Sequence, residues 1–345
     1  MTSRLLDKAT FDELLAAADF GRAISVLDDS DYGNDVEEAI IEGYRPTNID
    51  RALNRNLARN FTKIKEFFIG RPQELVNALL SRWDLFNLKT ILRGLSALVP
   101  KAEILRNLAP MGALDMVVLE EITDQPDLRA ALDAIVMFSP QWWIPYGQAI
   151  TPHMVEFMRE RDLSVLETAL DRLHYGKVAR VVQGWDSNST LVRKVVEMEV
   201  DSINITTLVR ICGLELEESR AEDYYVPGGT ISEEEFTHLM SLGLPENVTM
   251  ALDKTPYAAA LRKAAEQFEG KGEPVFQDEL DKYVIKECLS ISEDPLGIGV
   301  IIKYMWKKYL EVVNLRIIIR GKSIGLIESQ IRKELYLVDE KAEAK

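Results

Sequence analysis

Apolar residues recur at intervals of three and four along most of the chain, which is the spacing of one face of an α-helix. Residues 49–64 carry such a stripe at Ile49, Leu53, Leu57, Phe61 and Ile64, broad enough for a helix that faces a core. Residues 75–92, 192–209 and 302–319 show the same period. No segment shows a sustained period of two with β-branched enrichment. The pattern therefore predicts an all-α fold.

One short motif occurs three times at fixed offsets. It consists of an acid, an asparagine three residues later and an arginine six residues after that: Asp84, Asn87 and Arg93; Asp201, Asn204 and Arg210; Glu311, Asn314 and Arg320. A second string precedes each copy as Ala52-Leu53-Asn54-Arg55, Ala169-Leu170-Asp171-Arg172 and Glu279-Leu280-Asp281-Lys282, and 33 residues separate its third position from the asparagine, 54 to 87, 171 to 204 and 281 to 314. We predict three tandem pseudo-repeated helical units, 1–110, 111–229 and 230–345, each of an ordinary domain size.

A helix-breaking string lies midway between the two helical arms of each unit. The strings are Gly70-Arg71-Pro72, Gly184-Trp185-Asp186-Ser187 and Asp294-Pro295-Leu296-Gly297. Glycine reaches the positive φ that ends a helix and proline cannot continue one. Each unit is therefore expected to hold an antiparallel helix hairpin, around residues 45–97, 162–214 and 272–324.

The hairpin geometry predicts one ion pair in each unit. The basic residue of the first arm and the acid of the second are 29 apart in every copy, 55 to 84, 172 to 201 and 282 to 311, and their midpoints fall at the breakers. We therefore expect Arg55 to pair with Asp84, Arg172 with Asp201 and Lys282 with Glu311. The alternative is three unrelated surface charges, since exposed pairs are common and contribute only ~0–1 kcal/mol.

The charge balance argues against two classes of partner. The 345 residues include 41 Lys and Arg against 56 Asp and Glu, a formal charge of −15. Such a chain is not expected to bind nucleic acid or the anionic surface of a bilayer. Charged and polar residues interrupt the longest apolar stretches, so direct membrane insertion is not expected either. The two cysteines and the absence of an apolar leader core favour a reducing cytoplasm.

Candidate catalytic chemistry is weak. Arg320-Gly321-Lys322-Ser323 ends like a phosphate-binding loop, but Arg316 stands where the first glycine is required. The alternative is a helix C-terminus that Gly321 closes and whose negative dipole end Lys322 faces. His153, His174 and His238 are too far apart in sequence for a helical zinc motif, and the acidic run after Ser232 fits a capping box. No catalytic residue, cofactor or metal is predicted.

An aromatic cluster between two prolines has two interpretations. Trp142, Trp143 and Tyr146 lie between or beside Pro140 and Pro145. Exposed, they would suit a partner contact, because tryptophan and tyrosine dominate interface hot spots. Buried, they would fill a junction between packed helices, which is the commoner arrangement.

The threefold motif, together with the length and acidity of the chain, resembles the C subunits of the archaeal and bacterial V-type (A-type) ATP synthases, the counterparts of the eukaryotic d subunit. The resemblance covers nearly the whole chain and is strongest at Asp84–Gly94 and Glu311–Gly321, while Ile211 replaces the glycine in the second copy. It implies a funnel-like, three-unit protein without an active site, peripheral on the cytoplasmic face of the cell membrane. The implied partners are the central-stalk subunits of the rotary ATPase and the membrane proteolipid ring.

The implied function is that of a non-catalytic rotor subunit that transmits torque between ATP chemistry and ion transport. Two alternatives remain from the residues alone. A helical-repeat scaffold or adaptor of a soluble complex would also be built from packed helix pairs, but usually from many short units. An all-α hydrolase would need a cluster of titratable groups in a pocket.

Overall fold

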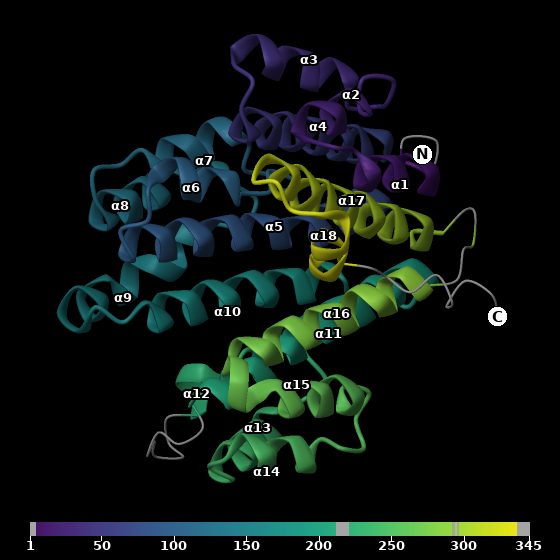
Figure 1. Ribbon diagram of the computed structural model, residues 1–345. Coiled ribbons are helices and arrows are strands. Elements are labelled where there is room, and N and C mark those ends of the chain that lie inside the picture. The colour runs from purple at the N-terminus through teal and green to yellow at the C-terminus, as the bar shows by residue number, and fades with distance from the viewer. Residues whose placement is uncertain (1–4, 212–220, 292–293, 295–296, 337–345) are drawn as a thin grey trace. The chain divides into compact units, whose positions relative to one another are not determined.

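The computed structural model describes residues 5–211, 221–291, 294 and 297–336. Within those residues the chain is built of helices joined by turns and contains no strand, so the predicted all-α class is confirmed (Figure 1). The first third holds α1 (Lys8–Ala16), α2 (Phe20–Ser25), α3 (Gly33–Glu42), α4 (Pro46–Phe67), α5 (Arg71–Ser96) and α6 (Lys101–Arg106).

The remaining helices form the middle and last thirds of the chain. The middle third holds α7 (Met116–Thr123), α8 (Leu128–Phe138), the short 3₁₀ helix η2 (Ser139–Gln141), α9 (Tyr146–Glu160), α10 (Leu163–Val181), α11 (Ser187–Ile211) and α12 (Ala221–Tyr224). The last third holds α13 (Glu233–Ser241), α14 (Pro245–Ala251), α15 (Ala258–Lys271), α16 (Pro274–Ser290), α17 (Gly299–Ser323) and α18 (Glu328–Glu334).

Local sequence signals explain where these helices begin. The first helix of each third is capped by a side chain that accepts from the backbone three residues on, Asp7 from Thr10, Asp115 from Val118 and Ser232 from Glu235. Proline occupies the first turn of α4 and α5, where its missing N–H costs nothing. Gly70, between α4 and α5, has φ 66°, as expected of a predicted breaker.

The six long helices lie where the two arms of each repeat were predicted. They do not pair only within their own repeat. In one compact region α4 packs against α17, the second arm of the last repeat, and in another α11 contributes to a core with α16, the first arm of that repeat. The α4 and α17 pair runs antiparallel, since Arg320 contacts Asp50 at one end and Tyr304 contacts Asn60 toward the other.

The chain forms two compact units. Unit 1 comprises residues 1–73, 86–124 and 289–345, and unit 2 comprises residues 74–85 and 125–288. Each unit draws on more than one of the sequence repeats. The division into three repeats at 1–110, 111–229 and 230–345 therefore remains a prediction about sequence copies.

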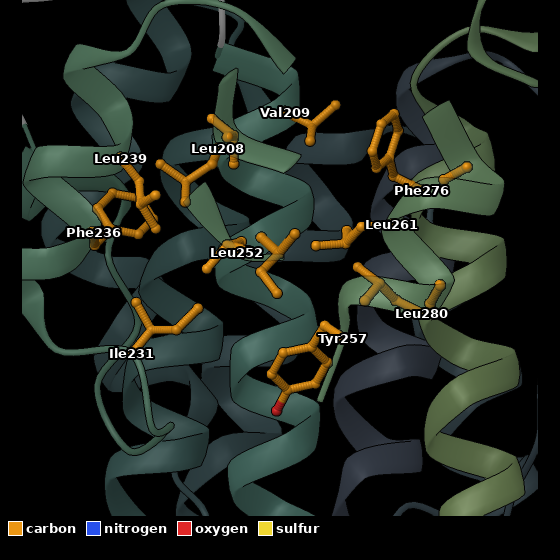
Figure 2. Packing of buried hydrophobic residues seen from close by; sticks show 14 of the residues in the cluster. Leu208, Val209, Ile231, Phe236, Leu239, Leu252, Tyr257, Leu261, Phe276 and Leu280 are labelled. Atoms are coloured by element: carbon orange, nitrogen blue, oxygen red, sulfur yellow. The ribbon is translucent and has the colours of Figure 1, made fainter. Parts of the chain in front are cut away.

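The core of unit 2 is assembled from helices far apart in sequence. Figure 2 shows Leu208 and Val209 of α11 with Leu261 of α15 and Phe276 and Leu280 of α16. All five are at most 5% exposed. Truncating a fully buried leucine such as Leu280 to alanine typically costs about 2–5 kcal/mol. Helices α11, α15 and α16 thus bury apolar residues against one another and form one core.

Candidate functional site

The repeated asparagine has the same role in all three copies. Its side-chain amide donates to the carbonyl, and its side-chain oxygen accepts from the N–H, of the residue 22 positions further on. The pairs are Asn87 with Ala109 (2.9 and 2.8 Å), Asn204 with Val226 (2.8 and 2.9 Å) and Asn314 with Tyr336 (3.1 and 2.9 Å). This two-way bond attaches the segment that follows the second arm to the arm itself. We call the three asparagines the anchor asparagines.

In the second and third copies, the repeated acid binds the opening segment of another repeat. Asp201 accepts from the backbone N–H groups of Thr230 (2.8 Å) and Ile231 (3.0 Å) and from the Tyr257 hydroxyl (2.8 Å). Glu311 accepts from the backbone N–H of Leu6 and from the Tyr32 hydroxyl, both at 2.6 Å. The acids are buried and hydrogen-bonded, so their repetition reflects a structural joint.

The predicted ion pairs between arms are wrong. Arg55 lies 3.3 Å from Glu42 and 3.8 Å from Glu38 of α3, instead of binding Asp84. Lys282 binds its helix neighbours Asp278 and Glu279 instead of Glu311, and Arg172 is exposed while Asp201 is bound as described above.

The reason for this error is helix rotation. Equal distance from a turn sets the height of two residues along a hairpin, but it does not set the face on which each lies. Asp84, Asp201 and Glu311 are at most 5% exposed, whereas the side chains of Arg55 and Lys282 are 38% and 46% exposed. The acids face the interior and the bases face the surface.

The repeated arginine differs between copies. Arg320 binds the Asp50 carboxylate of α4 at 2.9 Å, a contact between the last repeat and the first. Arg93 and Arg210 are exposed. Burial is the largest influence on Asp50 and raises the pKa of its carboxyl, against the nearby guanidinium of Arg320.

The tyrosines near the repeated acids do not lie at a fixed spacing in the sequence. Tyr32 and Tyr257 bind Glu311 and Asp201, and burial followed by the facing carboxylate raises the pKa of both phenols. Both therefore stay protonated donors. Tyr146, the first residue of α9, is buried near Asp84, and the charge of that acid adds to burial in raising its pKa. Tyr146 lies 25 residues before the third position of its string and Tyr32 only 22 before, so no fixed spacing revealed the set.

The aromatic cluster faces inward at its third member. Tyr146 is 1% exposed, its hydroxyl lies 3.0 Å from His174 Nδ1, and its ring meets that of Trp142 edge-on. A partner contact through Tyr146 is therefore wrong, and the junction interpretation holds for this residue. Trp142 and Trp143 are half-buried, and their contact with a partner stays a prediction.

The loop-like string near the C-terminus has a structural explanation. Lys322 is 8% exposed and donates to the carbonyls of Leu15 and Ala17, both at 2.6 Å, at the C-terminal end of α1. It neutralises the end of α1 instead of its own helix. The prediction that Gly321 ends the helix is wrong, because α17 continues to Ser323 and the glycine with positive φ is Gly325.

A partly buried pair lies between two repeats inside unit 2. Arg82 Nη1 lies 2.5 Å from Glu199 Oε1, and the Tyr175 hydroxyl donates to the other oxygen of Glu199 at 3.4 Å. Burial raises the pKa of the Glu199 carboxyl, while Arg82 opposes that shift. Arg82 and Glu199 occupy the same position of the repeat, two residues before the acid of the first and of the second copy respectively.

The described residues offer neither a metal site nor a membrane span. No group of three or more histidine, cysteine or acidic side chains among them is arranged to hold a metal ion. None of the helices in that part of the chain is both long and apolar enough to cross a bilayer. The anchor asparagines and the repeated acids Asp201 and Glu311 are bound to the protein's own backbone and side chains, and these contacts tie helices together.

Comparison with known proteins shows the family of the chain. A family model described as ATP synthase (C/AC39) subunit matches residues 1–334. The chain is 29% identical to the C subunit of the A-type ATP synthase of Methanococcoides burtonii, covering 98% of the chain and 91% of that protein. It is 28% identical to the C subunit of the V-type ATP synthase of Deinococcus radiodurans (97% and 88% covered) and 25% identical to that of the A-type ATP synthase of Thermococcus kodakarensis (97% and 87%). The chain therefore belongs to the ATP synthase (C/AC39) subunit family, whose sequence resemblance the threefold motif had indicated.

Proposed function

We propose that this chain is the rotor subunit that links the central stalk of a rotary ATPase to its membrane proteolipid ring and transmits torque between them. The observation that carries the proposal is the family match over residues 1–334, because it leaves no large part of the chain for another activity. The subunit is peripheral, on the cytoplasmic face of the membrane. Its three repeats are arranged like a funnel.

The packing of the helices supports a mechanical role. A torque coupler must resist bending, and helices packed along their length deform less than loops do. The anchor asparagines hold the segment after each second arm, and the repeated acids Asp201 and Glu311 hold the opening segment of another repeat. The ties of Asn204 to Val226 and of Glu311 to Tyr32 are buried, so water does not compete for them.

The charge of the chain supports protein partners. A formal charge of −15 suits docking against basic surfaces of the stalk or ring, since complementary charge speeds encounter and sets register. It does not suit nucleic acid or direct insertion into lipid. We expect binding to the rotor ring through its protein surface.

The chain is proposed to catalyse nothing by itself. The lysine of the loop-like string binds two backbone carbonyls, and the anchor asparagines, Asp201 and Glu311 are engaged in structural hydrogen bonds. Equilibrium dialysis with ATP and magnesium should give no saturable binding to the purified chain. Micromolar binding that Lys322→Ala abolishes would contradict this part of the proposal.

The coupling role is tested by reconstitution. A complex assembled without this subunit should keep ATP hydrolysis by its head and lose ATP-driven ion pumping in proteoliposomes. Adding the purified chain back should restore pumping, and the chain should bind both a detergent-solubilised ring and the isolated stalk. Intact pumping in the complex that lacks the subunit would refute the role.

A further inference from the structure

The first and third repeats meet at a junction whose contacting residues lie far apart in the sequence. Between the second and third repeats, Asp201 and Tyr257 are 56 residues apart in sequence. Between the third and first repeats, Glu311 and Tyr32 make the corresponding contact, but 279 residues separate them. We call this second junction the seam. All its described residues belong to unit 1.

Charged residues distinguish the seam from the other junctions. Lys308 is completely buried, and its Nζ lies 2.8 Å from Glu311 Oε1, 3.8 Å from Asp31 Oδ2 and 4.2 Å from the centre of the Tyr32 ring. The positions that correspond to Lys308, three residues before the acid, hold Ser81 and Met198. The positions that correspond to Asp31, directly before the tyrosine, hold Pro145 and Pro256.

The two differences occur together and touch each other. At the two junctions inside the chain the position three residues before the acid is neutral and the tyrosine follows a proline, whereas at the seam that position is a lysine, which lies over the ring of a tyrosine that follows an aspartate. A buried ammonium is costly unless it is paired. Asp31 and Glu311 supply that pairing, which a proline at position 31 would reduce.

We infer that Lys308, Glu311, Asp31 and Tyr32 form a latch that closes the first repeat onto the third and selects this pairing over the other two. The latch holds the N-terminal helices α1 to α3 on α17. Loop closure is entropically more demanding across the longer separation, so this junction has the greater need for specific contacts. The inference goes beyond the proposed function and does not depend on it.

Neighbouring contacts place the latch within a larger attachment. Glu311 also accepts from the Leu6 N–H, and Lys322 of the same helix binds the carbonyls at the end of α1. Arg332 of α18 lies 3.1 Å from Asp12 of α1. Opening the latch should therefore loosen residues 6–42 before it affects unit 2.

The test is amide hydrogen exchange of the full chain with one conservative change at each of two equivalent positions. Tyr32→Phe removes only the hydroxyl that binds Glu311 and should raise exchange about tenfold or more across residues 6–42. Tyr257→Phe is the matched variant, and its increase should be confined to the junction around residues 225–260. Equal acceleration of both segments by Tyr32→Phe, or none in residues 6–42, would overturn the latch.

A second pair of variants tests the charge itself. Lys308→Met introduces the residue found at position 198 and should raise exchange in residues 6–42 about a hundredfold or more, because the buried Glu311 carboxylate and the partly buried Asp31 carboxylate lose their cation. Lys282→Met removes an exposed lysine and should leave that segment unchanged. If the two variants behave alike, the latch is refuted. If Lys308→Met does not fold, the Tyr32→Phe measurement alone decides the matter.

Discussion

At the scale of single residues, the repeated asparagine is chosen by its chemistry. An amide side chain carries both a donor and an acceptor, so it can satisfy the N–H and the C=O of one buried residue at the same time. An aspartate could satisfy only the N–H, and an apolar side chain neither. Asn204 and Val226 are buried, so water cannot reach these groups and the two bonds are their means of satisfaction.

Replacing an anchor asparagine should therefore be expensive. Asn204→Ala removes two hydrogen bonds and leaves the N–H and C=O of Val226 without a partner. We expect a loss of about 2–4 kcal/mol, measured as a shift in the urea unfolding transition. Asn34→Ala, at an exposed position of α3, is the control and should change stability by about 0.5 kcal/mol or less. A loss no larger than the control's would contradict the anchor role.

Leu98 has a left-handed backbone conformation, and its replacement is expected to stabilise the protein instead of destabilising it. Leu98 has φ 56° and is 90% exposed, and the residue at its place in the third repeat is Gly325, with φ 77°. We call the glycine that directly follows the repeated arginine, Gly94 or Gly321, the motif glycine. In both copies the residue after the left-handed position donates its N–H to the carbonyl of this glycine, Val99 to Gly94 and Leu326 to Gly321, each at 2.9 Å. The turn is the same, but one copy fills its left-handed position with a side chain that favours other angles.

Leu98→Gly should stabilise the protein. Relief of the left-handed strain exceeds the extra chain entropy of glycine by about 0.5–1 kcal/mol. Thermal unfolding followed by circular dichroism would measure the gain. Leu98→Ala keeps the Cβ atom and should give no gain. If alanine stabilises as much as glycine, exposure of the leucine and not its φ is the cause.

At the scale of elements, the motif glycine permits a close helix contact. A Cβ atom on Gly321 would lie 2.7 Å from the Ile331 side chain of α18, and one on Gly94 would lie 2.6 Å from Ile104 of α6. The corresponding isoleucines thus pack directly on the backbone of the second arm. These glycines act through space and not through a special φ, since both lie inside helices.

Adding that Cβ atom should separate the helices. Gly321→Ala is expected to cost about 1–3 kcal/mol by overpacking against Ile331, despite the better helix propensity of alanine. Gly176→Ala in α10 meets nothing within 4 Å and should instead stabilise by about 0.5–1 kcal/mol. Opposite signs in denaturant unfolding would support the contact. A gain at both positions would show that α18 moves away without cost.

Sequence periodicity predicts helices well and helix partners poorly. The three spacings of 33 residues placed the six long helices and the turn at Gly70 correctly, because both depend on local signals. They did not reveal that α4 packs on α17, because a contact between residues 54 and 316 leaves no local trace. The burial of Asp201 and Glu311 was missed for the same reason, since their partners lie in segments outside the hairpin.

At the scale of the whole molecule, the two ends of the chain are attached to one helix. Leu6 binds Glu311 and Tyr336 binds Asn314, and these two residues of α17 are three positions apart, which corresponds to about 5 Å along a helix axis. Nine residues follow Tyr336 and five precede Leu6. Joining residue 345 to residue 1 would therefore leave a connection long enough to span the gap.

A circularly permuted chain should consequently fold. The new ends belong between Gln125 and Pro126, in the turn between α7 and α8 where the two compact units divide. Because this opening breaks no anchor or latch contact, we expect helicity by circular dichroism to be retained and the stability to change by about 2 kcal/mol or less. A permutant opened between Val312 and Val313 would cut α17 between Glu311 and Asn314 and should not fold. If both permutants fold equally well, the contacts that α17 makes with the two ends of the chain do not organise unit 1, and the latch would lose its basis.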